Sequence, residues 1–480
     1  MKKKSQASIK GALLCFPLLT LCSHGARANV KQKSSSKPNI LFILVDDMGY
    51  NDPSYMGSDF YETPNIDKLA KEGVMFTQAY ANAPNSAPSR SCIMTGLYTP
   101  RHGVYTVAPS TRGKSEDRKI IPIATADSVA SSFVSIAEAL SKQGYVSGHF
   151  GKWHMGEDEN GGHTGPISQG FSINVGGNKA GHPYTYFYPY EKNGEKHINL
   201  EGGQKGEYLT DRLTDEAIKF IKKEGHKKPF FVYLAHYAVH SPLQAPRALI
   251  DKYKAKLPGK YHKNPIYAAM IEDLDTDIGR VLQTLDDENL SENTMVVFFS
   301  DNGGSEPITD NFMLRGGKGM PYEGGIREPM IIRYPGVTKP GSVCNRPIMG
   351  TDFYPTFVDI AGGKPAKNLD GKDIFELMSD SKSRDLFWHF PAYLEGYKGM
   401  QGKWRATPFS IIRSGDWKLI YFYEDKHIEL YNLKTDIKEE HECSLDYPTI
   451  SKQLKLKLKR WLKKTNAPLP TQPNPDYIVK

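Results

Sequence analysis

Unbroken apolar runs recur along the chain, and stretches with helical spacing of apolar residues lie between them. The runs occupy residues 39–45, 229–235 and 294–300, whereas residues 132–144 and 267–285 show the helical spacing. Continuous apolarity without alternation is typical of strands buried on both faces of a parallel sheet. We therefore predict an α/β fold with a large, mostly parallel sheet sandwiched by helices, and with its chemistry at the carboxyl ends of the strands.

The pattern changes after about residue 375. Residues 409–433 read as three short antiparallel strands joined by SGD and EDK turns. Residues 450–464 place four apolar side chains at helical spacing, namely Leu454, Leu458, Trp461 and Leu462. We predict a catalytic domain over residues 29–375 and a smaller C-terminal subdomain of antiparallel sheet plus helix over residues 376–480. The lysines of the last helix are interpreted as its solvated face rather than as a membrane surface.

The first 28 residues differ from the rest of the chain. Lysines precede the apolar run GALLCFPLLTLC, and Ala26-Arg27-Ala28 follows it as a small-x-small cleavage site. This order of regions predicts a signal peptide over residues 1–28 and export, most simply to the periplasm. An alternative is lipid attachment at Cys22, although Leu21 is large for that processing. The apolar run is too short for a permanent transmembrane helix, so we expect no stable membrane insertion.

Charge and cysteine content narrow the functional classes. Removal of residues 1–28 takes away four lysines and Arg27 with no acid, which lowers the net charge of the 480-residue chain from +8 to +3. The remaining balance gives no argument for a nucleic-acid partner. Cys92, Cys344 and Cys443 then remain, too few for a disulfide framework, although one bridge between Cys344 and Cys443 stays open.

Oxygen-bearing side chains follow two of the predicted strands. Asp46 and Asp47 end the first run, and Asp301 and Asn302 end another, before a Gly-Gly pair. Capping of a turn explains one carboxylate easily and two adjacent ones less well. If both strand ends face one cleft, the four side chains suit a hard cation, Ca²⁺ or less readily Mg²⁺, and lack the His or Cys that zinc favours.

Basic side chains stand at similar positions. Lys152 and His154 follow a third strand in GHFGKWHMG, which lacks the glycine spacing of a phosphate-binding loop. Alternate residues of an extended segment point the same way, so both can face one anion. His240 follows a fourth strand and is a better catalytic candidate than His236, which we interpret as a packed neighbour. Lys318 lies between glycines, where a ligand can approach closely.

The stretch Ser86-x-Pro88-Ser89-Arg90, followed by Met94-Thr95-Gly96, resembles the sulfatase signature in its serine form. Further segments occur in that family's order across residues 38 to about 330: NILFILVDDMG, TPNIDKLAKEGVMF, GKWHMG, VHSP, SDNGG and GGKGMPYEGGIREP. The resemblance implies an alkaline phosphatase-like fold and hydrolysis of sulfate esters. It also implies that a radical-SAM maturation enzyme oxidises Ser86 to formylglycine before export, whose hydrate supplies the nucleophilic hydroxyl.

The resemblance also assigns roles to individual residues. It implies five calcium ligands, which are Asp46, Asp47, Asp301, Asn302 and the formylglycine at position 86.

The same resemblance assigns the catalytic and substrate-binding groups. Arg90 would hold the formylglycine hydrate, and Lys152 and Lys318 would bind the sulfate oxygens. His154 would be the base that releases sulfate from the covalent intermediate, and His240 would act as general acid on the leaving oxygen.

Two segments bear on the substrate, and two other functions stay open. Residues 177–190 and 388–405 are rich in aromatic, His and Arg groups, which suits either a sugar-binding rim or packing between domains. A sulfated saccharide is the expected substrate, and galactose or N-acetylhexosamine sulfates are the plausible targets.

One alternative function is that of a phosphatase or phosphodiesterase that uses unmodified Ser86, although such enzymes favour two metals with several His ligands. The other is a glycan-binding pseudoenzyme, which requires the loss of a catalytic residue, and none is evidently lost.

Overall fold

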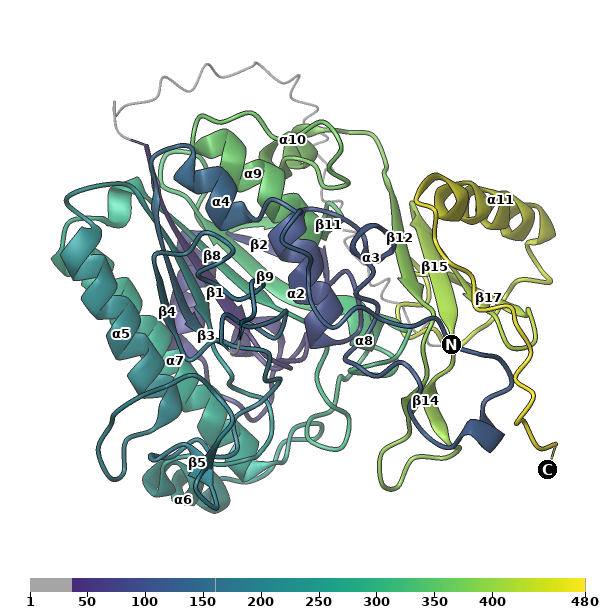
Figure 1. Cartoon of the computed structure of the whole chain (residues 1–480), viewed down its shortest axis with the longest axis horizontal. Helices are drawn as coiled ribbons and strands as arrows, with labels where there is room; N and C mark the ends of the chain where they lie inside the picture. The colour runs from purple at the N-terminus through teal and green to yellow at the C-terminus, as the bar shows by residue number, and fades with distance from the viewer. Residues whose placement is uncertain (1–36, 160, 480) are drawn as a thin grey trace, which may run out of the picture. The chain divides into compact units, whose positions relative to one another are not determined.

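A nine-stranded sheet forms the centre of the computed structural model, which describes residues 37–159 and 161–479 (Figure 1). Its strand order is β10-β2-β9-β8-β1-β7-β3-β4, with β11 also paired to β2. Strands β1, β3, β4, β7 and β8 run parallel, and β9 is antiparallel to both of its neighbours. The strands are β1 (Asn39–Val45), β2 (Val74–Tyr80), β3 (Val146–Gly151), β4 (Ile173–Val175), β7 (Phe230–Ala235), β8 (Thr294–Ser300), β9 (Arg327–Arg333), β10 (Ser342–Cys344) and β11 (Ile348–Met349).

Helices cover both faces of this sheet, which confirms the predicted α/β architecture. Leu41, Ile43 and Val45 of β1 join the apolar core on one face, and Ile40, Phe42 and Leu44 join the core on the other. The first core includes side chains of α1 (Pro64–Glu72), α5 (Leu209–Glu224), α6 (Arg247–Ala255) and α7 (Pro265–Asp287). The second includes side chains of α2 (Ser86–Thr95), α4 (Ile136–Ser141), α9 (Phe353–Ile360) and α10 (Ile374–Ser379).

The two helices predicted between the strands of the large sheet are present, but they begin and end at other residues than predicted. Helix α7 is longer than predicted because Pro265 takes its first turn and the Asn264 side chain accepts hydrogen bonds from the backbone N–H groups of Ile266 and Tyr267. Helix α4 is shorter, because a capping box between Ser135 and Glu138 starts it after residue 135.

The C-terminal part contains the predicted antiparallel sheet and helix. Strands β12 (Asp385–Phe390), β15 (Phe409–Ser414), β16 (Trp417–Phe422) and β17 (Ile428–Asn432) form the sheet, and β13 (Leu394–Glu395) pairs with β14 (Trp404–Ala406) in a short hairpin. Helix α11 (Pro448–Lys464) buries Leu454, Leu458, Trp461 and Leu462, as predicted. Strand β12 was not predicted, and the subdomain boundary near residue 375 stays a prediction.

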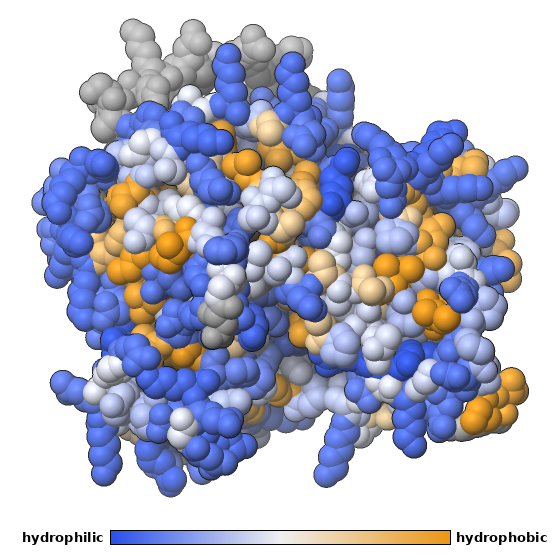
Figure 2. Space-filling model, viewed as in Figure 1, coloured by the Kyte–Doolittle hydropathy of each residue, from blue (hydrophilic) through white to orange (hydrophobic). Residues whose placement is uncertain are grey.

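Smaller elements complete the described structure. They are α3 (Thr99–His102), α8 (Glu323–Ile326), β5 (Glu191–Lys192) and β6 (Glu195–Lys196), with short 3-10 turns between elements. The face shown in Figure 2 is largely hydrophilic, with hydrophobic residues in separate patches.

Three sequence-based expectations concern the chain ends and the cysteines. The predicted signal peptide, with Cys22, lies outside the described residues. Within the described part, Cys92, Cys344 and Cys443 are free thiols, so the structure has no bridge between Cys344 and Cys443. No helix between residues 37 and 479, as far as the structure describes them, is long and apolar enough to cross a membrane.

Candidate functional site

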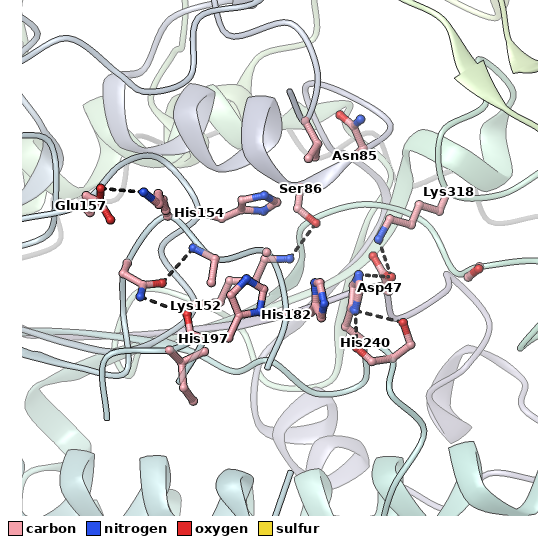
Figure 3. Close-up of a pocket in the computed structure, with 18 of the residues that line it drawn as sticks. Asp47, Asn85, Ser86, Lys152, His154, Glu157, His182, His197, His240 and Lys318 are labelled. Carbon is pink, nitrogen blue, oxygen red and sulfur yellow. Dashed lines mark hydrogen bonds and ion pairs between the residues drawn. The ribbon is translucent and has the colours of Figure 1, made fainter. Parts of the chain in front are cut away.

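The carboxyl ends of β1, β3, β7 and β8 open into one cavity of about 840 Å³, which Figure 3 shows with its lining side chains. These strands are neighbours in the order β8-β1-β7-β3, so the residues that follow them meet at one edge of the sheet. Asp46 and Asp47 follow β1, and Lys152 follows β3. His240 comes from the loop after β7, and Asp301 with Asn302 from the turn after β8.

Ser86 lies at the first position of α2 and points into this group of polar residues (Figure 3). Its Oγ lies 3.1 Å from Asp46 Oδ1 and 3.1 Å from Asn302 Oδ1, and Lys152 Nζ donates to it at 3.1 Å. The residue is only 1% exposed. Asn85 occupies the N-cap position, so the Ser86 hydroxyl is not a helix cap and is available to the site.

Three carboxylates converge beside Ser86. One oxygen from each of Asp46, Asp47 and Asp301 lies within 4.8 Å of the others, and all three residues are buried. Asn302 Nδ2 donates to Asp47 Oδ1 at 2.8 Å, and the backbone N–H of Asp47 donates to Asp301 Oδ1 at 3.3 Å. The structure therefore brings together the four side chains that were predicted to share a cation.

Each carboxylate has a close cationic partner, and Arg90 Nη2 also lies 3.7 Å from Asp46 Oδ1. Arg90 Nε is 2.8 Å from Asp301 Oδ2, Lys152 Nζ is 2.7 Å from Asp46 Oδ2, and Lys318 Nζ is 2.7 Å from Asp47 Oδ2. All of these side chains are buried or nearly so. Removal of one partner would leave the other as an uncompensated buried charge, which is far costlier than loss of a surface pair.

The carboxylates differ in acidity. Burial raises the pKa of Asp46 to about 7, and repulsion from Asp301 and Asp47 opposes the attraction of Lys152. Burial would also raise the pKa of Asp47, but the positive charges of Lys318 and Lys152 hold it below its ordinary value. Asp46 is thus the carboxylate for which further positive charge would be most favourable.

His154 lies on the cavity wall in a conformation that was not expected. Its φ of 63° is left-handed, so the prediction of an extended segment from Lys152 to His154 is wrong, although both residues line the cavity. The turn places the imidazole against Gly181 and leaves Nδ1 buried without a hydrogen-bond partner. Burial lowers the pKa of His154 well below its ordinary value, with Lys152 and Arg90 adding to the effect, so the ring is neutral near pH 7.

Gly181→Ala is expected to impair the site through His154. A methyl group at position 181 would lie 2.7 Å from His154 Cε1 and 2.8 Å from Nε2, so the ring must move. A displacement of about 1 Å predicts a loss of about 10- to 100-fold in kcat. Steady-state kinetics of the purified variant check this, with circular dichroism to confirm the fold. Unchanged kcat in a folded variant would show that the ring position is not critical.

His240 faces Asp47 across the cavity mouth. Its Nδ1 lies 2.7 Å from the carbonyl oxygen of Ser241, and because a carbonyl only accepts, Nδ1 carries the proton. The other ring nitrogen, Nε2, lies 3.5 Å from Asp47 Oδ2. Burial lowers the pKa of His240 to about 3, with Lys318 adding to the effect. His236 is fully buried and does not line the cavity, as predicted.

Several cavity residues escaped the sequence analysis. The ring of His182 stacks on that of His240, with centroids 5.9 Å apart. On its other contact, the ring centroid of His182 lies 4.8 Å from that of His197. His182 belongs to the segment 177–190 that was noted for its composition, whereas His197 and Arg112 carry no signal because they lie in irregular chain. Of the segment 388–405, Leu394 and Arg405 line the cavity, and Trp388 packs in the core instead.

Comparison with known proteins agrees with this geometry. A family model described as Sulfatase matches residues 38–363, and one described as N-sulphoglucosamine sulphohydrolase, C-terminal, matches residues 317–466. A sulfatase of Formosa agariphila is 36% identical, over 98% of this chain and 95% of its own length. Human N-acetylgalactosamine-6-sulfatase is 30% identical, over 73% of this chain and 68% of its own length.

A solved structure extends the likeness to three dimensions. The crystal structure of Ps i-CgsB in complex with k-i-k-neocarrahexaose has a TM-score of 0.75 and 31% sequence identity, and the match covers 92% of this chain and 95% of that one. The chain therefore belongs to the sulfatase family, whose members are sulfuric ester hydrolases.

Proposed function

We propose that this protein is an exported carbohydrate sulfatase whose nucleophile is formylglycine formed from Ser86, with Ca²⁺ as its cation. The observation that carries the proposal is the position of Ser86 Oγ, which contacts a carboxylate, an amide oxygen and an ammonium group at 3.1 Å each, at the base of the cavity. A serine in the sulfatase signature that was merely structural would not need these three partners.

The substrate class rests on the relatives and on the cavity. One relative is named for N-acetylgalactosamine 6-sulfate, and one neighbour was solved with a neocarrahexaose. The cavity here is lined by both charged and ring-bearing side chains, which suits a sulfated saccharide. We propose galactose or N-acetylhexosamine sulfates of complex glycans as substrates.

The donor set fits a calcium ion. Asp46, Asp47 and Asp301 supply converging carboxylate oxygens, and Asn302 supplies an amide oxygen, which are the ligands that hard cations prefer. The three carboxylates are balanced by Arg90, Lys152 and Lys318, so a bound divalent cation would leave the site with a net positive charge for an anionic ester. When bound, it would supply charge stabilisation for the sulfate oxygens.

Arg90 supports the modification of residue 86. It lies four residues after Ser86, on the same face of α2, and its Nη2 is buried without a hydrogen-bond partner. A second oxygen on residue 86 would give this orphan donor an acceptor. Formylglycine would supply a hydrate with two hydroxyl groups, one for attack on sulfur and one whose deprotonation expels sulfate.

The lysines are placed to stabilise the reacting group. Lys152 Nζ contacts both Ser86 and Asp46, and Lys318 Nζ contacts Asp47 on the opposite side (Figure 3). Negative charge that develops on the sulfate oxygens in the transition state would therefore meet two preorganised ammonium groups. Such groups stabilise the transition state more than the ground state, which raises kcat.

The two histidines divide the proton transfers. His154 is neutral and has a free ring nitrogen, so it can accept the proton of the second hydroxyl group. His240 directs Nε2 into the cavity, and an anionic ester beside it would raise its pKa toward the range in which it donates a proton to the leaving oxygen. General acid catalysis of this kind contributes about 10² to 10⁴ in rate.

The mass of the tryptic peptide 72–90, from protein purified from its native host, tests the proposal. We expect the peptide to lack two hydrogens at Ser86 and to form a hydrazone with an aldehyde reagent. This result would also support maturation by a radical-SAM enzyme before export. An unmodified serine in protein that actively hydrolyses esters would contradict the proposal and favour the phosphatase alternative.

A further inference from the structure

Six cationic side chains line the cavity around Ser86, and they differ in whether a carboxylate neutralises them. Lys152 pairs with Asp46, Lys318 with Asp47, Lys179 with Glu157 at 2.8 Å, and Lys196 with Glu201 at 2.6 Å. Arg112 and Arg405 form no ion pair with any residue that the structure describes. No carboxylate among the described residues lies within ion-pair distance of these two guanidinium groups, although the more distant charges of Asp47 and Glu306 attract Arg405.

The hydrogen-bonding capacity of the two arginines is also largely unused. The Nε atoms of both are buried without a hydrogen-bond partner. Arg112 makes one long contact, from Nη2 to the Val107 carbonyl oxygen at 3.4 Å, and no hydrogen bond of the Arg405 side chain is found among the described residues. A half-buried guanidinium with five donors and no acceptor is costly unless a ligand supplies one.

The chain segments that carry the two arginines pack against each other. Gly113, next to Arg112, lies directly on the ring of Trp404, where an added methyl group would come within 2.5 Å of it. Arg405 follows Trp404 in β14, and both Arg405 and Arg112 line the cavity. Burial lowers the pKa of Arg405, and the charge of Arg112 lowers it further, as expected for like charges in proximity.

Arg405 lies close to the segment that carries Lys318, a proposed sulfate ligand. A methyl group on Gly319 would lie 2.9 Å from Arg405 Nε, and Gly319 directly follows Lys318. The carboxylate of Glu306, which also acts on Arg405, is engaged by the hydroxyl of Tyr397. Arg405 thus packs beside the residue that follows a proposed sulfate ligand, and among the described residues it makes no ion pair with the carboxylates around Ser86, although the charge of Asp47 acts on it.

We propose that Arg112 and Arg405 form a second anion subsite, which binds a sulfate ester or carboxylate that stays on the substrate beside the sulfate being removed. This inference rests on the proposed function for the identity of the first anion. Guanidinium groups suit the role because their planar forks bind such oxyanions through paired, charge-assisted hydrogen bonds. The natural substrate is then a saccharide with at least two negative charges, and the arginines select it over a singly sulfated one.

The test compares three matched short saccharides: one with only the cleavable sulfate, one with an additional sulfate ester, and one with an additional uronate carboxylate. The wild-type protein is expected to prefer one of the doubly charged saccharides in kcat/KM. Arg405→Gln and Arg112→Gln are each expected to reduce that preference by about 10- to 100-fold, since each removes charge-assisted hydrogen bonds. The saccharide whose advantage falls identifies the second group as sulfate or carboxylate.

Two controls separate this subsite from general charge effects. Lys196→Gln removes a cation of the same cavity that is already paired with Glu201, and it is expected to leave the preference unchanged. Arg405→Lys keeps the charge but loses the fork, and it is expected to restore only part of the preference. Equal losses on singly and doubly charged saccharides in both arginine variants, or no preference in the wild type, would overturn the inference.

Binding to a Ser86→Ala background distinguishes failure of the subsite from failure of the proposed function. Calorimetry gives the Kd for the three saccharides without turnover, with and without Arg405→Gln or Arg112→Gln. Suppose that the wild-type protein releases sulfate from no saccharide, but that the affinity of the Ser86→Ala protein for the doubly charged saccharides still depends on Arg405. The proposed function then fails and the subsite stands. If sulfate is released and affinity is independent of both arginines, the function stands and the subsite fails.

Discussion

Ser86→Ala is expected to reduce sulfate release by about 10⁴-fold or more, because it removes the oxygen from which the nucleophile is formed. Transition-state stabilisation by Lys152, Lys318 and the proposed cation cannot replace a missing nucleophile. The fold is expected to survive. Lys152 keeps its ion pair with Asp46, and the lost hydrogen bonds of one hydroxyl cost about 1–2 kcal/mol in the free energy of unfolding. Sulfate release from a sulfated saccharide, followed by ion chromatography, measures the effect.

Ser91→Ala is the matched control for this substitution. Ser91 is buried in the same helix and outside the signature, and its hydroxyl donates to the carbonyl oxygen of Ala87 rather than to the site. Its loss removes the same atom from the same element without touching the cavity. Comparable activity of Ser91→Ala and the wild type, together with inactive Ser86→Ala, is the expected pattern. Full activity of Ser86→Ala would exclude residue 86 as the nucleophile.

Removal of divalent cations is expected to lower kcat by about 10² to 10⁴, which corresponds to several kcal/mol of lost charge stabilisation. Three buried carboxylates converge in the site, and without a cation the pKa of Asp46 is raised to about 7. Loss of the two charges of the cation leaves less positive charge to attract and stabilise an anionic ester, and uptake of one proton by Asp46 offsets only part of that loss. The thermal midpoint of unfolding should fall as well, because a ligand that binds only the folded state stabilises it.

Chelation followed by metal analysis and readdition makes this prediction specific. Ca²⁺ is expected to restore activity more fully than Mg²⁺, since the site offers several protein oxygens and Mg²⁺ retains its waters more strongly. The melting temperature of each metal-loaded form gives a readout that does not depend on turnover. Unchanged rates in protein with verified depletion would contradict the cation role of Asp46, Asp47 and Asp301.

Local patterns account for most of the fold. The apolar runs of β1, β7 and β8 are recognisable because strands buried on both faces need apolar side chains at every position. Helix ends were less predictable, since the capping interactions of α4 and α7 decide them rather than periodicity. Strand β12 was missed because its aromatic residues resemble a binding rim as much as a buried strand.

The site divides along similar lines. Asp46, Asp47, Asp301 and Asn302 could be assigned to one cluster from sequence because parallel neighbouring strands end at the same edge of a sheet. The left-handed turn at His154 and the position of its ring against Gly181 could not be predicted from the sequence. Residues 154 and 181 are 27 positions apart and meet only through the fold.

The sequence by itself determined the α/β architecture, the C-terminal sheet and helix, and the set of chemical groups at the strand ends, because each depends on residues close together in the chain. Only the tertiary structure decided which cation neutralises which carboxylate and which cations remain unpaired. Arg112 and Arg405 are 293 positions apart, and they line one cavity, where Gly113 packs on Trp404. Contacts of this kind depend on the path of the whole chain, and no local pattern records them.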